Sequence, residues 1–143
     1  MNWIKRNALY LAWITALAAT LGSLYFQYVQ GFPPCILCWY QRIAMYPLVL
    51  LIPIGLARKD TNLPLYVLPL SIIGGGIAVY HNLLYYKIIP ESLAPCIQGI
   101  SCTTKFIEWG GFITIPLLSL TAFIVVTILM IVTWKGANHE QGT

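Results

Sequence analysis

The sequence predicts an all-α membrane protein, a bundle of four transmembrane helices with both termini cytoplasmic. Of its 143 residues, 59% are hydrophobic and only 8% are charged, whereas soluble domains carry about 25% charged residues. Four apolar segments are long enough to cross about 30 Å of hydrocarbon, which takes roughly 20 helical residues. Too few residues remain for a soluble catalytic domain. We therefore expect a single integral membrane domain (residues 1–143) whose activity resides in the bundle or its loops.

The first helix is expected at residues 8–28. It follows Lys5 and Arg6 and contains Ala16-Leu17-Ala18, so it could instead be a cleaved secretory signal. Its apolar residues continue to Phe26, further than the core of a signal peptide needs. This length favours a retained transmembrane helix.

The second helix is expected at residues 39–57 and the third at 63–86. Gly74, inside the third, forms a small-xxx-small pair with Ala78, a pattern that lets membrane helices approach closely. The fourth helix is expected at residues 112–134, after the longest loop at 87–111. The short polar tail from Gly136 is expected to be disordered.

Aromatic side chains cluster near the ends of the predicted helices. Tryptophan and tyrosine are enriched where a membrane protein meets the two water interfaces. We therefore expect most of them to anchor the bundle at the lipid boundary. They are Trp3, Tyr10, Trp39, Tyr40, Tyr85, Tyr86, Trp109 and Trp134.

The orientation follows from the cations, which favour cytoplasmic loops. If the chain crosses the membrane four times, five cations lie on one side of the membrane and three on the other. The five are Lys5, Arg6, Arg58, Lys59 and Lys135, and the three are Arg42, Lys87 and Lys105. The five-cation side is then cytoplasmic, and all four cysteines face outward, where disulfides persist. The net charge of +4 is explained by this topology and suggests no nucleic-acid partner.

The cysteines form two pairs, Cys35 with Cys38 and Cys96 with Cys102. The first pair has the C-x-x-C spacing and stands at the start of the second helix, where unsatisfied N–H groups favour the thiolate. Such pairs suit thiol–disulfide exchange. Arg42 follows at helical spacing on the same face, and an arginine inside a membrane is a functional hypothesis. The alternative is an arginine that extends to the outer headgroups.

Three interpretations of the two pairs are open. A zinc site is disfavoured because C-x₅-C is a poor half-site and the outer loops contain no histidine, so no metal is expected. Two structural disulfides are possible in outer loops, although a bridge across so short a segment stabilises little. The third is a redox relay, in which a loop pair exchanges with a partner protein and a membrane pair passes electrons inward.

The sequence has no nucleotide, flavin or haem motif, so a quinone dissolved in the lipid is the natural acceptor. His81 is expected at a depth similar to that of Arg42 and could hydrogen-bond a quinone oxygen. It could equally bond the backbone of a neighbouring helix. Tyr80, Asn82 and Tyr85 are lesser candidate contacts.

The sequence resembles the DsbB family of bacterial disulfide-bond formation proteins, most closely its short members of the BdbC type. The resemblance extends through all four helices. The matching stretches are "CILCWYQR" at 35–42, "AVYHNLL" at 78–84, "CIQGISC" at 96–102 and "WGGFITIPLLSL" at 109–120.

The resemblance implies an enzyme that reoxidises an extracytoplasmic thioredoxin-like thiol oxidase, of the DsbA or BdbD type, and passes the electrons to menaquinone or ubiquinone. By position, Cys96 would form the mixed disulfide with the partner and Cys102 would exchange with Cys35. Cys38 would face the quinone beside Arg42, with His81 nearby. Larger members have widely separated loop cysteines, whereas only five residues intervene here, so the order of exchange stays open.

Two other functions compete with this one. A non-enzymatic four-span scaffold would use the outer cysteines as structural disulfides. A reductase similar to the vitamin K epoxide reductase group would run the chemistry in the other direction. The position of the C-x-x-C on the second helix argues against the reductase.

Overall fold

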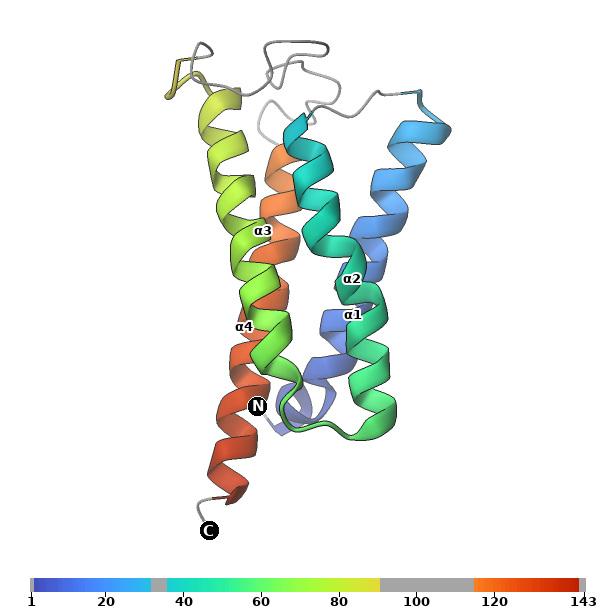
Figure 1. Cartoon of the computed structure of the whole chain (residues 1–143), viewed down its shortest axis with the longest axis vertical. Helices are drawn as coiled ribbons and strands as arrows, with labels where there is room; N and C mark the ends of the chain where they lie inside the picture. The colour runs from blue at the N-terminus through green and yellow to red at the C-terminus, as the bar shows by residue number, and fades with distance from the viewer. Residues whose placement is uncertain (1, 32–35, 91–114, 142–143) are drawn as a thin grey trace.

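The computed structural model describes residues 2–31, 36–90 and 115–141. Its helices are α1 (Asn2–Tyr28), α2 (Ile36–Arg58), α3 (Leu63–Tyr85) and α4 (Ile115–Gln141). Helices α1 and α3 each pack against both α2 and α4, and successive helices run in opposite directions (Figure 1). All four are long and apolar enough to cross a membrane, which confirms the predicted all-helical, four-span architecture.

The helices extend beyond the apolar segments that predicted them. Helix α1 begins at Asn2 rather than at residue 8, α2 begins at Ile36 rather than 39, and α4 runs to Gln141 rather than 134. The expectation of a disordered tail from Gly136 is therefore wrong as far as Gln141. Hydropathy marks where a helix crosses hydrocarbon, and the backbone hydrogen bonds of α4 continue past that boundary because no proline interrupts them.

The turn between α2 and α3 is tight because α2 ends in a Schellman motif. The amide of Asp60 donates to the carbonyl of Gly55 at 3.0 Å, and that of Lys59 to the carbonyl of Leu56 at 3.3 Å. Lys59 adopts a left-handed conformation with φ of 54°. Asn62 occupies the N-cap position of α3, but its side chain makes no capping hydrogen bond.

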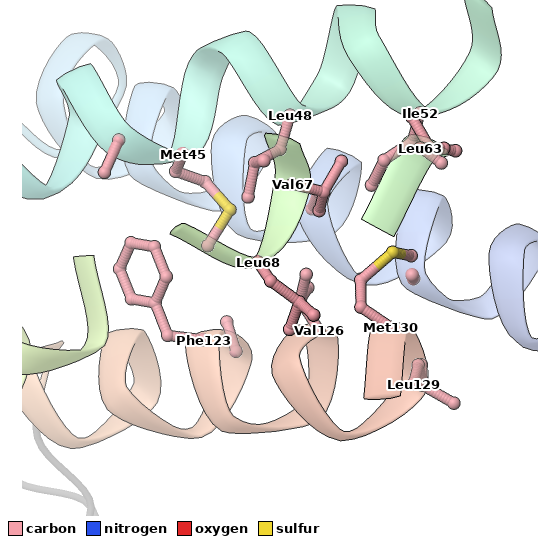
Figure 2. Close-up of a cluster of buried hydrophobic side chains, with 14 of the residues drawn as sticks. Met45, Leu48, Ile52, Leu63, Val67, Leu68, Phe123, Val126, Leu129 and Met130 are labelled. Carbon is pink, nitrogen blue, oxygen red and sulfur yellow. The ribbon is translucent and has the colours of Figure 1, made fainter. Parts of the chain in front are cut away.

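The core lies between all four helices and is apolar (Figure 2). Gly74 is required there, because a Cβ at this position would collide with the ring of Phe123 and lie 2.9 Å from the Cβ of Ala44. Ala78, one turn later, is fully buried. The Gly74 and Ala78 pair therefore serves close helix packing, as predicted. The side chains labelled in Figure 2 are Met45, Leu48, Ile52, Leu63, Val67, Leu68, Phe123, Val126, Leu129 and Met130.

Most of the predicted interfacial aromatics that fall within the described ranges are exposed on the bundle surface. They are Trp3, Tyr10, Trp39, Tyr40, Tyr86 and Trp134. Tyr85 is an exception, with only 5% of its surface exposed. It stands seven residues after the buried Ala78, which places it on the inward face of α3. The prediction of Tyr85 as an anchor is therefore wrong, and Trp109 lies outside the described residues.

Candidate functional site

The first site residue that the structure describes is Cys38, the third residue of α2. Its side chain is half-buried and packs against a small apolar cluster built on Leu37 of α2 and Leu84 of α3. Cys38 thus lies at the end of the bundle opposite to the termini, where α2 begins and α3 ends (Figure 1). The predicted partners Cys35, Cys96 and Cys102 lie outside the described residues.

Arg42 follows Cys38 by four residues and reaches across to α1. Its Nε donates to Ser23 Oγ at 2.7 Å, one terminal nitrogen donates to Gln27 Oε1, and the other donates to the carbonyl of Ser23 at 3.2 Å. The guanidinium carbon also lies 5.2 Å from the centre of the Trp39 ring, within range of a cation–π interaction. Only 9% of Arg42 is exposed. The side chain is thus held between α1 and α2.

The contacts described for Arg42 are all with neutral groups. Asp60, which follows the last residue of α2 by two, lies at the end of that helix opposite to Arg42. It accepts hydrogen bonds from the backbone amide of Asn62 and the hydroxyl of Tyr66. A buried cation surrounded by dipoles remains strongly attractive to an anion or an electron-rich oxygen, because a low-dielectric site screens it little. The environment of Arg42 is thus suited to a negatively charged ligand.

His81 is almost completely buried, with 2% of its surface exposed. Its Nδ1 lies 3.0 Å from Nε2 of Gln41 on α2. The same Gln41 side chain accepts a hydrogen bond from the Ser119 hydroxyl of α4, with Oγ 2.5 Å from Oε1. One amide therefore joins three helices through a buried polar chain.

Asn82 adds a second polar link between α3 and α4. Its Nδ2 donates to the carbonyl of Ala78 at 2.8 Å and to that of Pro116 at 2.9 Å. Asn82 Oδ1 is buried and has no hydrogen-bond partner among the described residues. Asn82 thus joins α3 to the first turn of α4, and Ser119, three residues after Pro116, joins α4 to α2.

Arg42 and His81 lie at similar depth, as the sequence predicted, because Gln41 contacts His81 directly. They lie on different sides of α2, however, since Arg42 bonds α1 whereas Gln41 bonds α3 and α4. Adjacent residues on a helix point about 100° apart. Of the lesser candidates, Tyr80 is half-buried beside the Leu37 and Leu84 cluster, and Tyr85 is buried.

Sequence analysis missed four polar residues of the site. Ser23 and Gln27 are spaced i, i+4 in an otherwise apolar stretch of α1, and Gln41 and Ser119 stand within stretches that carried the family resemblance. A polar residue in a membrane helix usually faces a protein partner. That rule could have selected them as candidates, but it could not have paired Ser23 with Arg42 or Ser119 with Gln41.

The fold and the site together define a class: a four-helix membrane protein whose second helix carries Cys38, the second cysteine of a C-x-x-C motif, in its first turn and a buried arginine one turn further on. Comparison with known proteins gives the family. The model of the disulfide bond formation protein DsbB matches residues 5–134. The chain therefore belongs to the DsbB family, and its role is that of a membrane thiol–disulfide oxidoreductase.

Individual relatives agree with this assignment. Disulfide bond formation protein C of Bacillus subtilis is 48% identical over 132 residues, which cover 92% of this chain and 95% of the relative. A probable disulfide formation protein C of Halalkalibacterium halodurans is 45% identical over 85% of this chain and 89% of its own. A probable disulfide formation protein of Metapseudomonas resinovorans is 41% identical, with 92% and 90% covered. No solved structure matches the chain.

Proposed function

We propose that this protein reoxidises an extracytoplasmic thioredoxin-like thiol oxidase of the DsbA or BdbD type and passes the electrons to a quinone in a bacterial cell membrane. The observation that carries the proposal is the buried, dipole-bound Arg42 one helical turn after Cys38. Burying a cation in a membrane is unfavourable, and such residues usually serve a function. A purely structural scaffold would not need this charge.

The proposed orientation places the cysteines outside and the termini in the cytoplasm. Both ends of the described chain lie at one end of the bundle, as does the α2–α3 turn that carries Arg58 and Lys59 (Figure 1). Short loops rich in lysine and arginine stay cytoplasmic. Cys38 is at the other end of α2 and thus on the extracytoplasmic face.

The loop pair performs the first exchange in this scheme. A thiolate of the reduced partner attacks the Cys96–Cys102 disulfide at Cys96 and releases Cys102 as a thiolate. The second partner thiolate then attacks the mixed disulfide, which leaves the partner oxidised and the loop pair reduced. Two electrons have entered the loop pair in this step. The assignment of Cys96 and Cys102 to these steps follows the family resemblance.

The membrane pair receives the electrons next. A Cys102 thiolate attacks the Cys35–Cys38 disulfide at Cys35 and releases Cys38 as a thiolate. The Cys96 thiolate then attacks Cys102, which re-forms the loop disulfide and releases Cys35. A bound quinone supplies the chemistry of accepting two electrons and two protons. Arg42 would bind and orient the electron-rich oxygen of that group beside Cys38, and its charge would favour the Cys38 thiolate.

The residues beneath Arg42 fit a polar head group in an apolar setting. Thr20 Oγ1 on α1 and the hydroxyl of Tyr46 on α2 are both buried, and within the part of the chain that the structure describes neither has a hydrogen-bond partner. They stand about one turn further into the membrane than Ser23 and Arg42, respectively. Buried hydroxyls normally have partners. A quinone carbonyl could accept a hydrogen bond from either, so Arg42, Thr20 and Tyr46 are the residues that would hold it.

The energetics favour electron flow toward a quinone. Thiol oxidases of the partner type are themselves strong oxidants, with a potential near −120 mV in one case. A glutathione pool is too reducing to reoxidise them. Each 30 mV is about 1.4 kcal/mol for a two-electron couple, so a quinone several tens of millivolts above the partner suffices to drive turnover.

Stopped-flow mixing tests the proposal. Purified protein in detergent is mixed with a reduced thioredoxin-like oxidase and a short-chain quinone, and the loss of quinone absorbance is followed together with partner thiols. We expect quinol and partner disulfide to form in equal amounts, and Cys38→Ser to abolish both. Persistence of both quinone and partner thiols with the unmodified protein would contradict the proposal.

A trapping experiment tests the proposed partner class and the outward orientation. With Cys102→Ser, Cys96 cannot form the loop disulfide. Its thiolate can instead attack the disulfide of an oxidised partner, so a mixed disulfide through Cys96 should accumulate in intact cells. A thioredoxin-like exported protein in the adduct is the expected result. Cytoplasmic adducts alone would place the loop pair on the wrong side and overturn the scheme.

A further inference from the structure

The two halves of α1 are attached to the rest of the bundle in different ways. In the inner half, Ala8, Ala12 and Ala16 are fully buried. They recur every four residues, so they share one face of the helix. The indole nitrogen of Trp13 donates to the backbone carbonyl of Val49 on α2 at 3.2 Å. The inner half of α1 is therefore fixed both by close packing and by a hydrogen bond to α2.

The outer half of α1, residues 17–28, is held more loosely. Of these residues, all of which the structure describes, none is buried. Gly22 has open space where a Cβ would lie. In Figure 1 the outer end of α1, in light blue, stands apart from the ends of the other three helices. The hydrogen bonds that the structure describes between this half and α2 are those that Arg42 donates to Ser23 and Gln27.

A quinone cannot reach Arg42 in the arrangement that the structure shows. Only 9% of Arg42 is exposed, and Thr20 Oγ1 and the Tyr46 hydroxyl are buried. A ligand dissolved in the lipid can therefore contact these groups only after part of the bundle has moved. The parts of a fold that open most readily are those with few buried contacts. Here that part is the outer half of α1, whereas Met45 and Leu48 fix α2 in the core.

We infer that the outer half of α1 is a gate, which swings away from α2 to admit a lipophilic ligand from the bilayer to Arg42 and then closes over it. The hydrogen bonds from Arg42 to Ser23 and Gln27 are the latch that holds the gate closed. The inner half, fixed at Trp13 and Ala16, is the pivot. That the ligand is a quinone rests on the proposed function, but the movement of α1 does not.

The latch and a ligand can occupy Arg42 at the same time. A guanidinium carries five N–H donors, and the hydrogen bonds to α1 use three of them. The other two have no acceptor within the described part of the chain, so they can bind a ligand oxygen while the gate is closed. The latch must break whenever the gate opens. A weaker latch therefore speeds both the entry and the exit of a ligand.

Chemical labelling of arginine measures the opening of the gate in the ligand-free protein. Phenylglyoxal, a small lipophilic reagent that modifies guanidinium groups, is added to the purified protein in lipid nanodiscs. Mass spectrometry then compares the labelling rate of Arg42 with that of Arg58, the exposed last residue of α2. We expect Arg42 to be labelled slowly, at a rate set by the open fraction, and Arg58 to be labelled fast.

Ser23→Ala tests the latch. It removes one hydrogen bond to Arg42, so the labelling rate of Arg42 should rise about threefold, the equivalent of the roughly 0.6 kcal/mol average for a hydrogen bond between membrane helices. Thr15→Ala is the matched control, because Thr15 bonds the carbonyl of Leu11 within α1. It should leave the rate unchanged.

A second pair of variants separates movement of α1 from movement of the Arg42 side chain alone. Ala16 stands seven residues before Ser23, about two helical turns from the latch. Ala16→Gly should ease bending at the pivot and raise the labelling of Arg42 up to about fivefold, the equivalent of the roughly 1 kcal/mol by which glycine weakens a helix relative to alanine. Ala8→Gly makes the same change further from the pivot and should have no effect.

The gate requires faster labelling of Arg42 in both Ser23→Ala and Ala16→Gly, with both controls unchanged. Any other pattern would overturn it, including a rise in Ser23→Ala alone, which would mean that the arginine side chain moves without α1. Adding a short-chain quinone to the unmodified protein tests the proposed function separately, because a ligand under the closed gate should slow the labelling of Arg42. No protection by quinone, together with the expected rates in the variants, would overturn the proposed quinone site and leave the gate in place.

Discussion

The end of the bundle that carries Cys38, which we propose to be its outer end, and the interior of the bundle are held together by different interactions. At the outer end, Arg42 and Gln41 of α2 make hydrogen bonds to α1, α3 and α4. Further in, the same helix packs through Met45, Leu48 and Ile52 into an apolar core (Figure 2). Apolar packing stabilises without directing chemistry, whereas buried polar groups stabilise little beyond apolar replacements of similar shape. We therefore expect the polar end to determine activity and the apolar interior to determine stability.

The comparison predicts that substitutions at the outer end change turnover and that substitutions in the interior change stability. Arg42→Met should produce the largest effect, a loss of about 100-fold in kcat/KM for quinone reduction, because it removes a preorganised charge. Its thermal unfolding temperature in detergent should change little or rise, since a buried cation is lost. Quinone absorbance and thermal unfolding measure the two quantities.

Arg58→Met is the matched control for Arg42→Met. Arg58 is the exposed last residue of the same helix, so its substitution should leave quinone turnover intact in purified protein. Equal losses of quinone turnover in the two variants would show that the position of the positive charge on α2 does not matter. That result would contradict a specific role for the outer end.

The interior is probed by Gly74. Gly74→Ala should destabilise the bundle by about 2 kcal/mol, because the new Cβ overlaps the buried Phe123 ring and Ala44. Gly76, two residues later, has open space at the corresponding position, so Gly76→Ala should be neutral or slightly stabilising. Unfolding in increasing amounts of a denaturing detergent compares the two. Equal stability of the variants would contradict the close packing of α2, α3 and α4.

The contact between α1 and Arg42 predicts a smaller effect. Ser23→Ala removes the acceptor of the Arg42 Nε hydrogen bond, so the guanidinium is held less firmly and the KM for quinone should rise by about fivefold, or about 1 kcal/mol. Thr15→Ala is the control, because Thr15 bonds the carbonyl of Leu11 within its own helix. Steady-state kinetics at several quinone concentrations separate KM from kcat. A fall in kcat with KM unchanged would refute a positioning role for Ser23.

The smallest effect is expected for Ser71→Ala, which removes an interior hydrogen bond between α3 and α4. Hydrogen bonds between membrane helices contribute about 0.6 kcal/mol on average, so the unfolding free energy should fall by that order. Turnover should not change, because Ser71 lies in the interior. A large loss of turnover in Ser71→Ala would contradict the expectation that interior substitutions change stability and not activity.

The sequence was sufficient to predict the spans, because a run of about 20 apolar residues has few alternatives to a membrane helix. It also singled out Arg42 and His81, since polar residues are rare in such helices. It did not show that Tyr85 is buried or that α4 continues to Gln141. Those outcomes depend on which side of a helix meets a neighbour and on how far backbone hydrogen bonding extends into water.

What the sequence by itself determined is the membrane class, the four helices, and the chemistry gathered in "CILCWYQR". What only the tertiary structure decided is how that chemistry is divided: Arg42 bonds α1, and its neighbour Gln41 joins Ser119 to His81. Composition and residue spacing are properties of one continuous segment, so they can be recognised in the sequence alone. A hydrogen bond between helices depends on the rotation and depth of both, and these are set by the packing of the whole bundle.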